Sequence, residues 1–138
     1  MSLEIHINRL QHIGLPVTNL AASKAFYETL GFTAVMASTF PHPEGTGHVA
    51  MLQHGDIVIE LYELPSSALS EIRVRSNGHI DHIAFDVSDI DATLLSLQSA
   101  GHTIVEPTPV FLPFWTNGCK YFNILGPDGE RLEFNQIL

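Results

Sequence analysis

The stretch Leu10–Leu20 reads LQHIGLPVTNL, and Ile80–Ile90, which lies 70 residues further along, reads IDHIAFDVSDI. At the same spacing, GFTAV at Gly31–Val35 aligns with GHTIV at Gly101–Val105. A histidine, a glycine and two valines therefore recur in register without a gap. Self-similarity at one fixed spacing is the signature of a duplicated structural module. The chain is thus expected to contain two copies of one module.

Each copy predicts a strand, a helix and then three more strands. The first strand alternates apolar and polar residues, as a half-buried strand does. Asn19 and Asp89 follow as helix N-cap signals, and Gly31 and Gly101 as helix stops. The expected strands are 10–17, 33–38, 47–54 and 57–64 with a helix at 20–30, then 80–87, 103–106, 119–125 and 131–136 with a helix at 90–100.

No linker rich in proline, glycine or serine separates the two copies. We therefore expect one domain over residues 1–138, with module 1 at about 8–65 and module 2 at about 78–136. The predicted fold is α+β, with two tandem βαβββ modules forming a curved, incomplete barrel around a metal site. The inner faces of the two sheets are expected to enclose a cavity.

The charge balance excludes some kinds of partner. The chain has a net charge of −9 with only six lysines and arginines, so it cannot assemble the basic surface that nucleic acid requires. No apolar run approaches the roughly 20 residues of a membrane-spanning helix. The single cysteine, Cys119, rules out a disulfide within the chain and favours a cytoplasmic location.

Four residues stand out as candidate metal ligands. His12 and His82 occupy equivalent positions in the two first strands, opposite the aliphatic face. Glu60 and Glu133 lie in the last strand of each copy, flanked by apolar residues. A buried carboxylate needs a positive partner. Two carboxylates and two neutral imidazoles can hold one divalent cation, which nickel, zinc, cobalt, manganese or iron could supply.

Three further features each have two interpretations. The remaining histidines are expected to be non-ligands, although His42 and His48, in or beside a predicted loop at 40–47, could reach a substrate. The aromatic stretch 111–115 (FLPFW) is either a lid or cavity wall, or a packed loop or dimer contact. Cys119 is expected to be a packed residue rather than a nucleophile.

The motifs around the four candidates resemble the vicinal oxygen chelate (glyoxalase/bleomycin resistance/dioxygenase) superfamily. The resemblance covers roughly residues 8–136, and it rests on LQHI at Leu10–Ile13, VIEL at Val58–Leu61, GHIDHIAFDV at Gly78–Val87 and GPDGERLEF at Gly126–Phe134. Members of this superfamily are often dimers, so the ligands could be shared between two chains.

The His-Glu-His-Glu set resembles that of glyoxalase I, the lactoylglutathione lyases. That resemblance implies a metal-dependent lyase or isomerase, with the metal stabilising an enediolate formed from a small carbonyl substrate with vicinal oxygens. It implies Glu133 as the catalytic base, with Glu60 as the candidate on the opposite face. Methylmalonyl-CoA epimerases are similar but usually carry Gln at the position of Glu60. The resemblance also leaves open a different superfamily enzyme, or a protein that sequesters a small molecule or antibiotic.

One departure from glyoxalase I concerns glutathione. The bacterial enzymes usually have an arginine a few residues after the first ligand, where this chain has Leu15-Pro16-Val17. Recognition of glutathione is therefore not expected from the sequence, and the apolar stretch 111–115 favours a more apolar substrate.

Overall fold

The computed structural model describes residues 5–78, 80–127 and 131–138. The chain forms two compact units, one of His12–Asp81 and the other of the residues up to Gln11 together with His82–Leu138. We call them the first and the second unit. The first strand, β1 (Ile7–Pro16), passes from the second unit into the first between Gln11 and His12.

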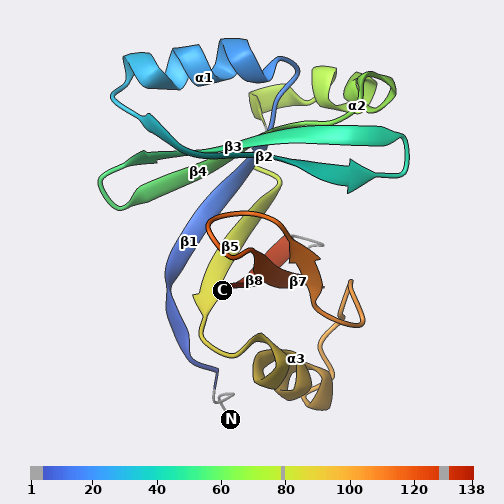
Figure 1. Ribbon diagram of the computed structural model, residues 1–138. Helices are drawn as coiled ribbons and strands as arrows, with labels where there is room; N and C mark the ends of the chain where they lie inside the picture. The colour runs from blue at the N-terminus through green and yellow to red at the C-terminus, as the bar shows by residue number, and fades with distance from the viewer. Residues whose placement is uncertain (1–4, 79, 128–130) are drawn as a thin grey trace. The chain divides into compact units, whose positions relative to one another are not determined.

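The first unit is a four-stranded sheet with a helix on one face. Its strands have the order β2-β3-β4-β1, with β1 and β4 parallel and the other neighbours antiparallel. Helix α1 contacts these strands and lies along one face of the sheet (Figure 1). Besides β1, the elements are α1 (Leu20–Thr29), β2 (Thr33–His42), β3 (Gly45–His54), β4 (Ile57–Glu63), the short α2 (Leu69–Arg73) and 3-10 turns at Ser66–Ala68 and Ser76–Gly78.

Helix α1 begins where the sequence predicts. The Asn19 side chain accepts a hydrogen bond from the backbone amide of Ala22 at 3.0 Å, which satisfies a free amide of the first turn. The chain leaves the helix at Gly31, whose φ of +95° is the left-handed conformation that favours glycine. The core beneath the helix consists of Ala50, Leu52, Ile59 and Leu61.

The second unit repeats this plan. Its sheet has the order β5-β8-β7-β6, again with the first and last strands of the module, β5 and β8, parallel. Phe122 stacks on Phe134 with ring centroids 5.4 Å apart, and α3 packs its apolar face on them. The elements are β5 (His82–Val87), α3 (Ile90–Ser99), β6 (Val110–Leu112), β7 (Cys119–Leu125) and β8 (Arg131–Ile137).

The α+β class and the two βαβββ modules are confirmed, and neither four-stranded sheet closes on itself. Helices α1 and α3 match their predicted spans to within one residue at the C-terminal end. No helix of the described residues is long and apolar enough to cross a membrane.

Two local predictions are wrong. Residues 103–106 form only an isolated bridge between Ile104 and Ile124, and the second strand of the module is β6, further along. Pro107 and Pro109 explain the difference, because proline has no N–H to donate to a ladder. The predicted loop at 40–47 is instead the tip of the β2–β3 hairpin, whose pairing continues to the pair His42 and Gly45.

Candidate metal centre

The first unit brings His12 and Glu60 together. Strands β1 and β4 run parallel with Gly14 beside Glu60, and His12 lies two residues earlier on the same face. His12 Nε2 is 3.8 Å from Glu60 Oε2. Both residues are buried, with 1% and 9% of their surface exposed. Gly14 has no side chain, so the carboxylate has room beside it.

The second unit repeats the pair with His82 and Glu133. Strands β5 and β8 run parallel with Ala84 beside Glu133, which is the same register as in the first unit. His82 Nε2 is 3.6 Å from Glu133 Oε1, and each residue is 7% exposed. Again a small residue adjoins the carboxylate. The four predicted ligands therefore occur as two buried His–Glu pairs of matching construction.

The donor set of each pair fits a divalent metal. Both N···O separations exceed the 3.5 Å reach of a hydrogen bond. Two ligands bonded at about 2.1 Å to one ion lie about 3.4 Å apart at a tetrahedral centre, which is within about half an ångström of both separations. Two carboxylates from two such pairs would balance the charge of a dication, and two imidazoles suit transition metals.

Glu133 has polar neighbours in the second unit. Asn135 Nδ2 donates to Glu133 Oε2 at 3.0 Å, and Gln11 Nε2 donates to Asn135 Oδ1 at 3.1 Å. Asn123 lies directly opposite Glu133 on β7. The Asn123 amide donates to Glu106, and its buried Oδ1 has no hydrogen-bond partner among the described residues.

Glu60 has a more apolar neighbour in the first unit. Met51 lies directly opposite it on β3. Two residues after Glu60, the Tyr62 hydroxyl donates to the Asp81 carboxylate. Burial raises the pKa of the Tyr62 phenol above its usual range, and the negative charge of Asp81 raises it further. Arg75, which is hydrogen-bonded to Glu71, lies 3.7 Å from Asp81 and offsets part of that effect.

The sequence did not single out these supporting polar residues. Gln11 and Asp81 do align at the 70-residue spacing, each directly before a candidate histidine. Their shared polarity was the available signal. The roles of Asn123 and Asn135 depend on register between strands, which the sequence pattern does not specify.

Two other predictions can be compared with the structure. Cys119 is fully buried and accepts a hydrogen bond from Asn135 at 3.8 Å, which is in keeping with a packed residue. The aromatic residues of the stretch 111–115 lie in different environments. Phe111 is exposed on β6, Phe114 is buried, and Trp115 adopts a left-handed φ of +64°.

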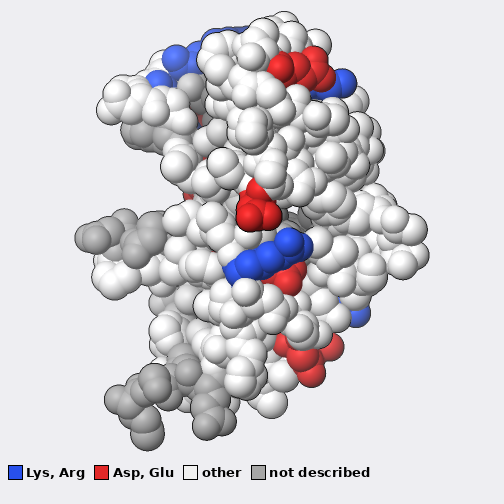
Figure 2. Space-filling model, turned by 90° about the vertical axis from the view of Figure 1, so that its left-hand side faces the viewer, with Lys and Arg blue, Asp and Glu red and all other residues white. Residues whose placement is uncertain are grey.

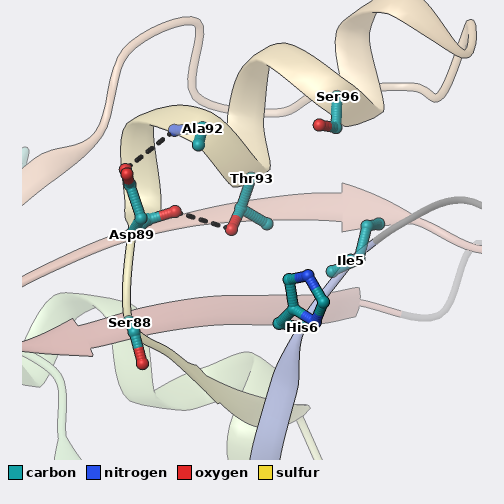
Figure 3. A pocket seen from close by; sticks show the side chains of 7 residues that line it. All are labelled: Ile5, His6, Ser88, Asp89, Ala92, Thr93 and Ser96. Carbon is teal, nitrogen blue, oxygen red and sulfur yellow. Dashed lines mark hydrogen bonds between the residues drawn. The ribbon is translucent and has the colours of Figure 1, made fainter.

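A separate cavity of about 140 Å³ lies in the second unit, where residues before β1 face α3 (Figure 3). Its polar lining includes His6, Ser88, Thr93 and Ser96. Thr93 Oγ1 donates to the Asp89 backbone carbonyl oxygen at 2.7 Å, which anchors one wall. None of the four candidate ligands lines this cavity.

The repeated βαβββ module with a buried His–Glu pair in each copy defines the class of protein, a duplicated α+β domain with candidate metal ligands on its strands. Residues 9–134 match the model of the Glyoxalase/Bleomycin resistance protein/Dioxygenase superfamily, and the chain belongs to that superfamily.

The similar proteins agree with this assignment. The uncharacterized protein YwbC of Bacillus subtilis is 33% identical over 129 residues, covering 93% of this chain and 97% of the relative. The uncharacterized protein YaeR of Escherichia coli is 32% identical over 128 residues, covering 92% and 95%. The structure of methylmalonyl-CoA epimerase from Mycobacterium tuberculosis has a TM-score of 0.75 and 23% identity, covering 100% of this chain and 93% of that one, and so shares the fold.

Proposed function

We propose that His12, Glu60, His82 and Glu133 together hold one divalent metal ion, and that the protein is a metal-dependent lyase or isomerase of the glyoxalase I type. The observation that carries the proposal is the repetition of a buried His–Glu pair, each with a small residue beside its carboxylate. One pair supplies only two ligands, so a stable site requires both. The two pairs can come from one chain or from two copies of it in a homodimer.

A bound divalent ion would supply Lewis-acid polarisation of two neighbouring substrate oxygens. Glu133, whose carboxylate would loosen from the ion, acts as the base, and Glu60 is the second candidate for that role. The C–H bond next to the carbonyl breaks, its proton moves to Glu133 Oε1, and the electron pair moves onto the carbonyl oxygen to give an enediolate. Glu133 then returns the proton to the former carbonyl carbon. The hydroxyl proton of the first carbon moves to the second carbon's oxygen, so the reaction is an isomerisation that needs no further reactant.

The substrate class we propose is a small carbonyl compound with vicinal oxygens. Figure 2 shows a face on which most residues are uncharged and the few Lys and Arg side chains are interspersed with Asp and Glu. Such a surface suits a small neutral or weakly charged molecule better than a polyanion. The segment Leu15-Pro16-Val17 offers no cation to a glutathione carboxylate. A thiol adduct smaller than that of glutathione therefore fits the chain better, and we propose a cytoplasmic location for the protein.

The test begins with the metal content of the protein as purified, followed by removal of metal and reloading with cobalt, nickel, zinc, manganese or iron(II). Methylglyoxal is then supplied with glutathione or with 2-mercaptoethanol, and thioester formation is followed. We expect one ion per set of four ligands and turnover that depends on it. Glu133→Gln should lower turnover by about 10²–10⁴-fold, the usual contribution of a general base.

Glu28→Gln is the matched control, because Glu28 is an exposed carboxylate on α1. It should leave metal content and turnover unchanged. Full turnover by Glu133→Gln with its metal retained would remove Glu133 as the base. Epimerisation of a methylmalonyl thioester without thioester formation from methylglyoxal would favour an epimerase instead. Stoichiometric binding of a small molecule by metal-free protein would favour a sequestering protein.

A further inference from the structure

The second unit contains a buried chain of side-chain amides that ends on Glu133. Gln11 and Asn135 are 4% and 3% exposed. Gln11 Nε2 donates to Asn135 Oδ1 at 3.1 Å and to the Asn135 backbone carbonyl oxygen at 3.2 Å. Asn135 Nδ2 donates onward to Glu133 Oε2 at 3.0 Å and to Cys119 Sγ at 3.8 Å. Every polar atom of the Asn135 amide is therefore used.

Asp86 determines which way the side-chain amides of Gln11 and Asn135 are turned. Both of its carboxylate oxygens accept hydrogen bonds, and Gln11 Nε2 donates to its Oδ1 at 3.0 Å. Asn8 Nδ2 donates to the other oxygen of Asp86, also at 3.0 Å. Gln11 must therefore present its nitrogen to Asp86 and to Asn135. Asn135 must then accept with its oxygen, which leaves its nitrogen facing Glu133.

We propose that Asn135 is a positioning residue that fixes Oε2 of Glu133, and that Gln11 and Asp86 set the orientation of its amide. This proposal rests on the proposed function, in which Glu133 is both a metal ligand and the base. With Oε2 held by Asn135, the other oxygen, Oε1, is the one that faces His82 at 3.6 Å. Oε1 is therefore the oxygen presented to the metal and to the substrate proton.

The first unit has a pair of polar residues at the equivalent positions. Tyr62 lies two residues after Glu60, as Asn135 lies two residues after Glu133. Asp81 directly precedes His82, as Gln11 directly precedes His12. Tyr62 and Asp81 are hydrogen-bonded to each other, as Asn135 and Gln11 are. Both units thus pair the residue two positions after their glutamate with the residue directly before a candidate histidine, with different chemistry in each. A hydrogen-bonded pair that recurs at equivalent positions in both units is a feature of the site rather than an accident of packing.

The experiment measures Co²⁺ affinity and the visible absorption spectrum of the Co²⁺-loaded protein, which reports the geometry of the ligands. The variants are Asn135→Ala, Gln11→Leu and the double variant. Residues that support a metal ligand typically contribute 10–100-fold to affinity or activity. We expect Asn135→Ala to weaken Co²⁺ binding by about 10–100-fold and to change the spectrum. Gln11→Leu should have a smaller effect of the same kind.

The double variant is the decisive member of this set. If Gln11 acts through Asn135, removing both should weaken Co²⁺ binding no more than Asn135→Ala alone, because residues in one network are not additive. Thr93→Val is the matched control, since Thr93 is 8% exposed in the same unit and donates only to the helix backbone. It should lower thermal stability without changing Co²⁺ affinity or the spectrum. Asn135→Asp, which keeps the shape but gains a charge, replaces Asn135→Ala if that variant fails to fold.

Unchanged Co²⁺ affinity and spectrum in folded Asn135 variants would overturn the positioning role while leaving the metal site intact. Additive effects of Asn135→Ala and Gln11→Leu would show that Gln11 acts by another route. Failure of the unsubstituted protein to bind Co²⁺ would instead overturn the proposed function itself. The two failures are therefore distinguished by the behaviour of the unsubstituted protein.

Discussion

The response of thermal stability to metal tests whether the two His–Glu pairs serve one ion. His12→Ala removes a ligand from the first unit, and His82→Ala removes the equivalent ligand from the second. Each protein is compared with itself before and after metal removal, so the effect of the substitution on the metal-free fold cancels. If one ion needs both pairs, the two variants should lose the metal response equally.

The size of the response follows from mass action. An ion that binds only the folded protein stabilises it by about 2.7 kcal/mol when its free concentration is 100 times Kd. At about 2.1 cal/mol/K per residue, the unfolding entropy of 138 residues is about 290 cal/mol/K, so Tm should rise by about 9 °C. A 100-fold loss of affinity, which is the upper end for residues that only support a ligand, would leave about 0.4 kcal/mol, or about 1.4 °C. Loss of a metal ligand itself should leave a still smaller rise in Tm on adding the metal.

The assay is a thermal melt followed by circular dichroism, with Co²⁺ or chelator. His102→Ala is the matched control, because His102 is an exposed histidine of the second unit and should keep the full rise of about 9 °C. A full rise in His12→Ala together with its loss in His82→Ala would refute the one-ion arrangement. The ion would then belong to the second unit alone.

Three further predictions test the packing that supports the site. Phe122→Ala should destabilise the protein to urea by about 3–5 kcal/mol, because the ring is fully buried and its removal leaves a cavity. Gly118→Ala should destabilise more than Gly101→Ala: both have positive φ, but a Cβ at 118 would lie 2.3 Å from an aromatic ring, whereas nothing lies within 4 Å at 101. Equal melting temperatures would contradict this. Asp89→Ala should lower stability by about 1 kcal/mol and speed amide exchange in the first turn of α3, as Asn19→Ala should do in α1.

The duplicated fold was predictable because both copies of the module can be recognised directly in the amino-acid sequence. The period-2 strands, the caps at Asn19 and Asp89 and the stop at Gly31 are all local signals, and each is found where expected. The strand predicted at 103–106 is wrong for a local reason too, because Pro107 and Pro109, which follow it, have no N–H to continue the pairing. There Glu106 instead accepts hydrogen bonds from the backbone and side chain of Asn123.

The pairing within the candidate site was predictable only in part. The repeat predicted that His12 resembles His82 and Glu60 resembles Glu133, but it did not say which histidine adjoins which glutamate. That depends on the parallel register of the first and last strand of each module, which is a contact between residues about 50 apart in sequence. The amide chain through Asn135 was hidden for the same reason.

The two modules differ most around their glutamates, and this difference bears on which carboxylate is the base. Met51 is the cross-strand neighbour of Glu60, whereas the cross-strand neighbour of Glu133 is Asn123. A base must give up and regain a proton beside a polar substrate, so it benefits from polar groups that hold both the carboxylate and the substrate. Asn135 holds one oxygen of Glu133, and the buried side-chain amide of Asn123 lies directly opposite Glu133 on the neighbouring strand. The duplicated positions would supply ligands from both modules in the proposed site, and the polar surroundings favour Glu133 as the proposed base.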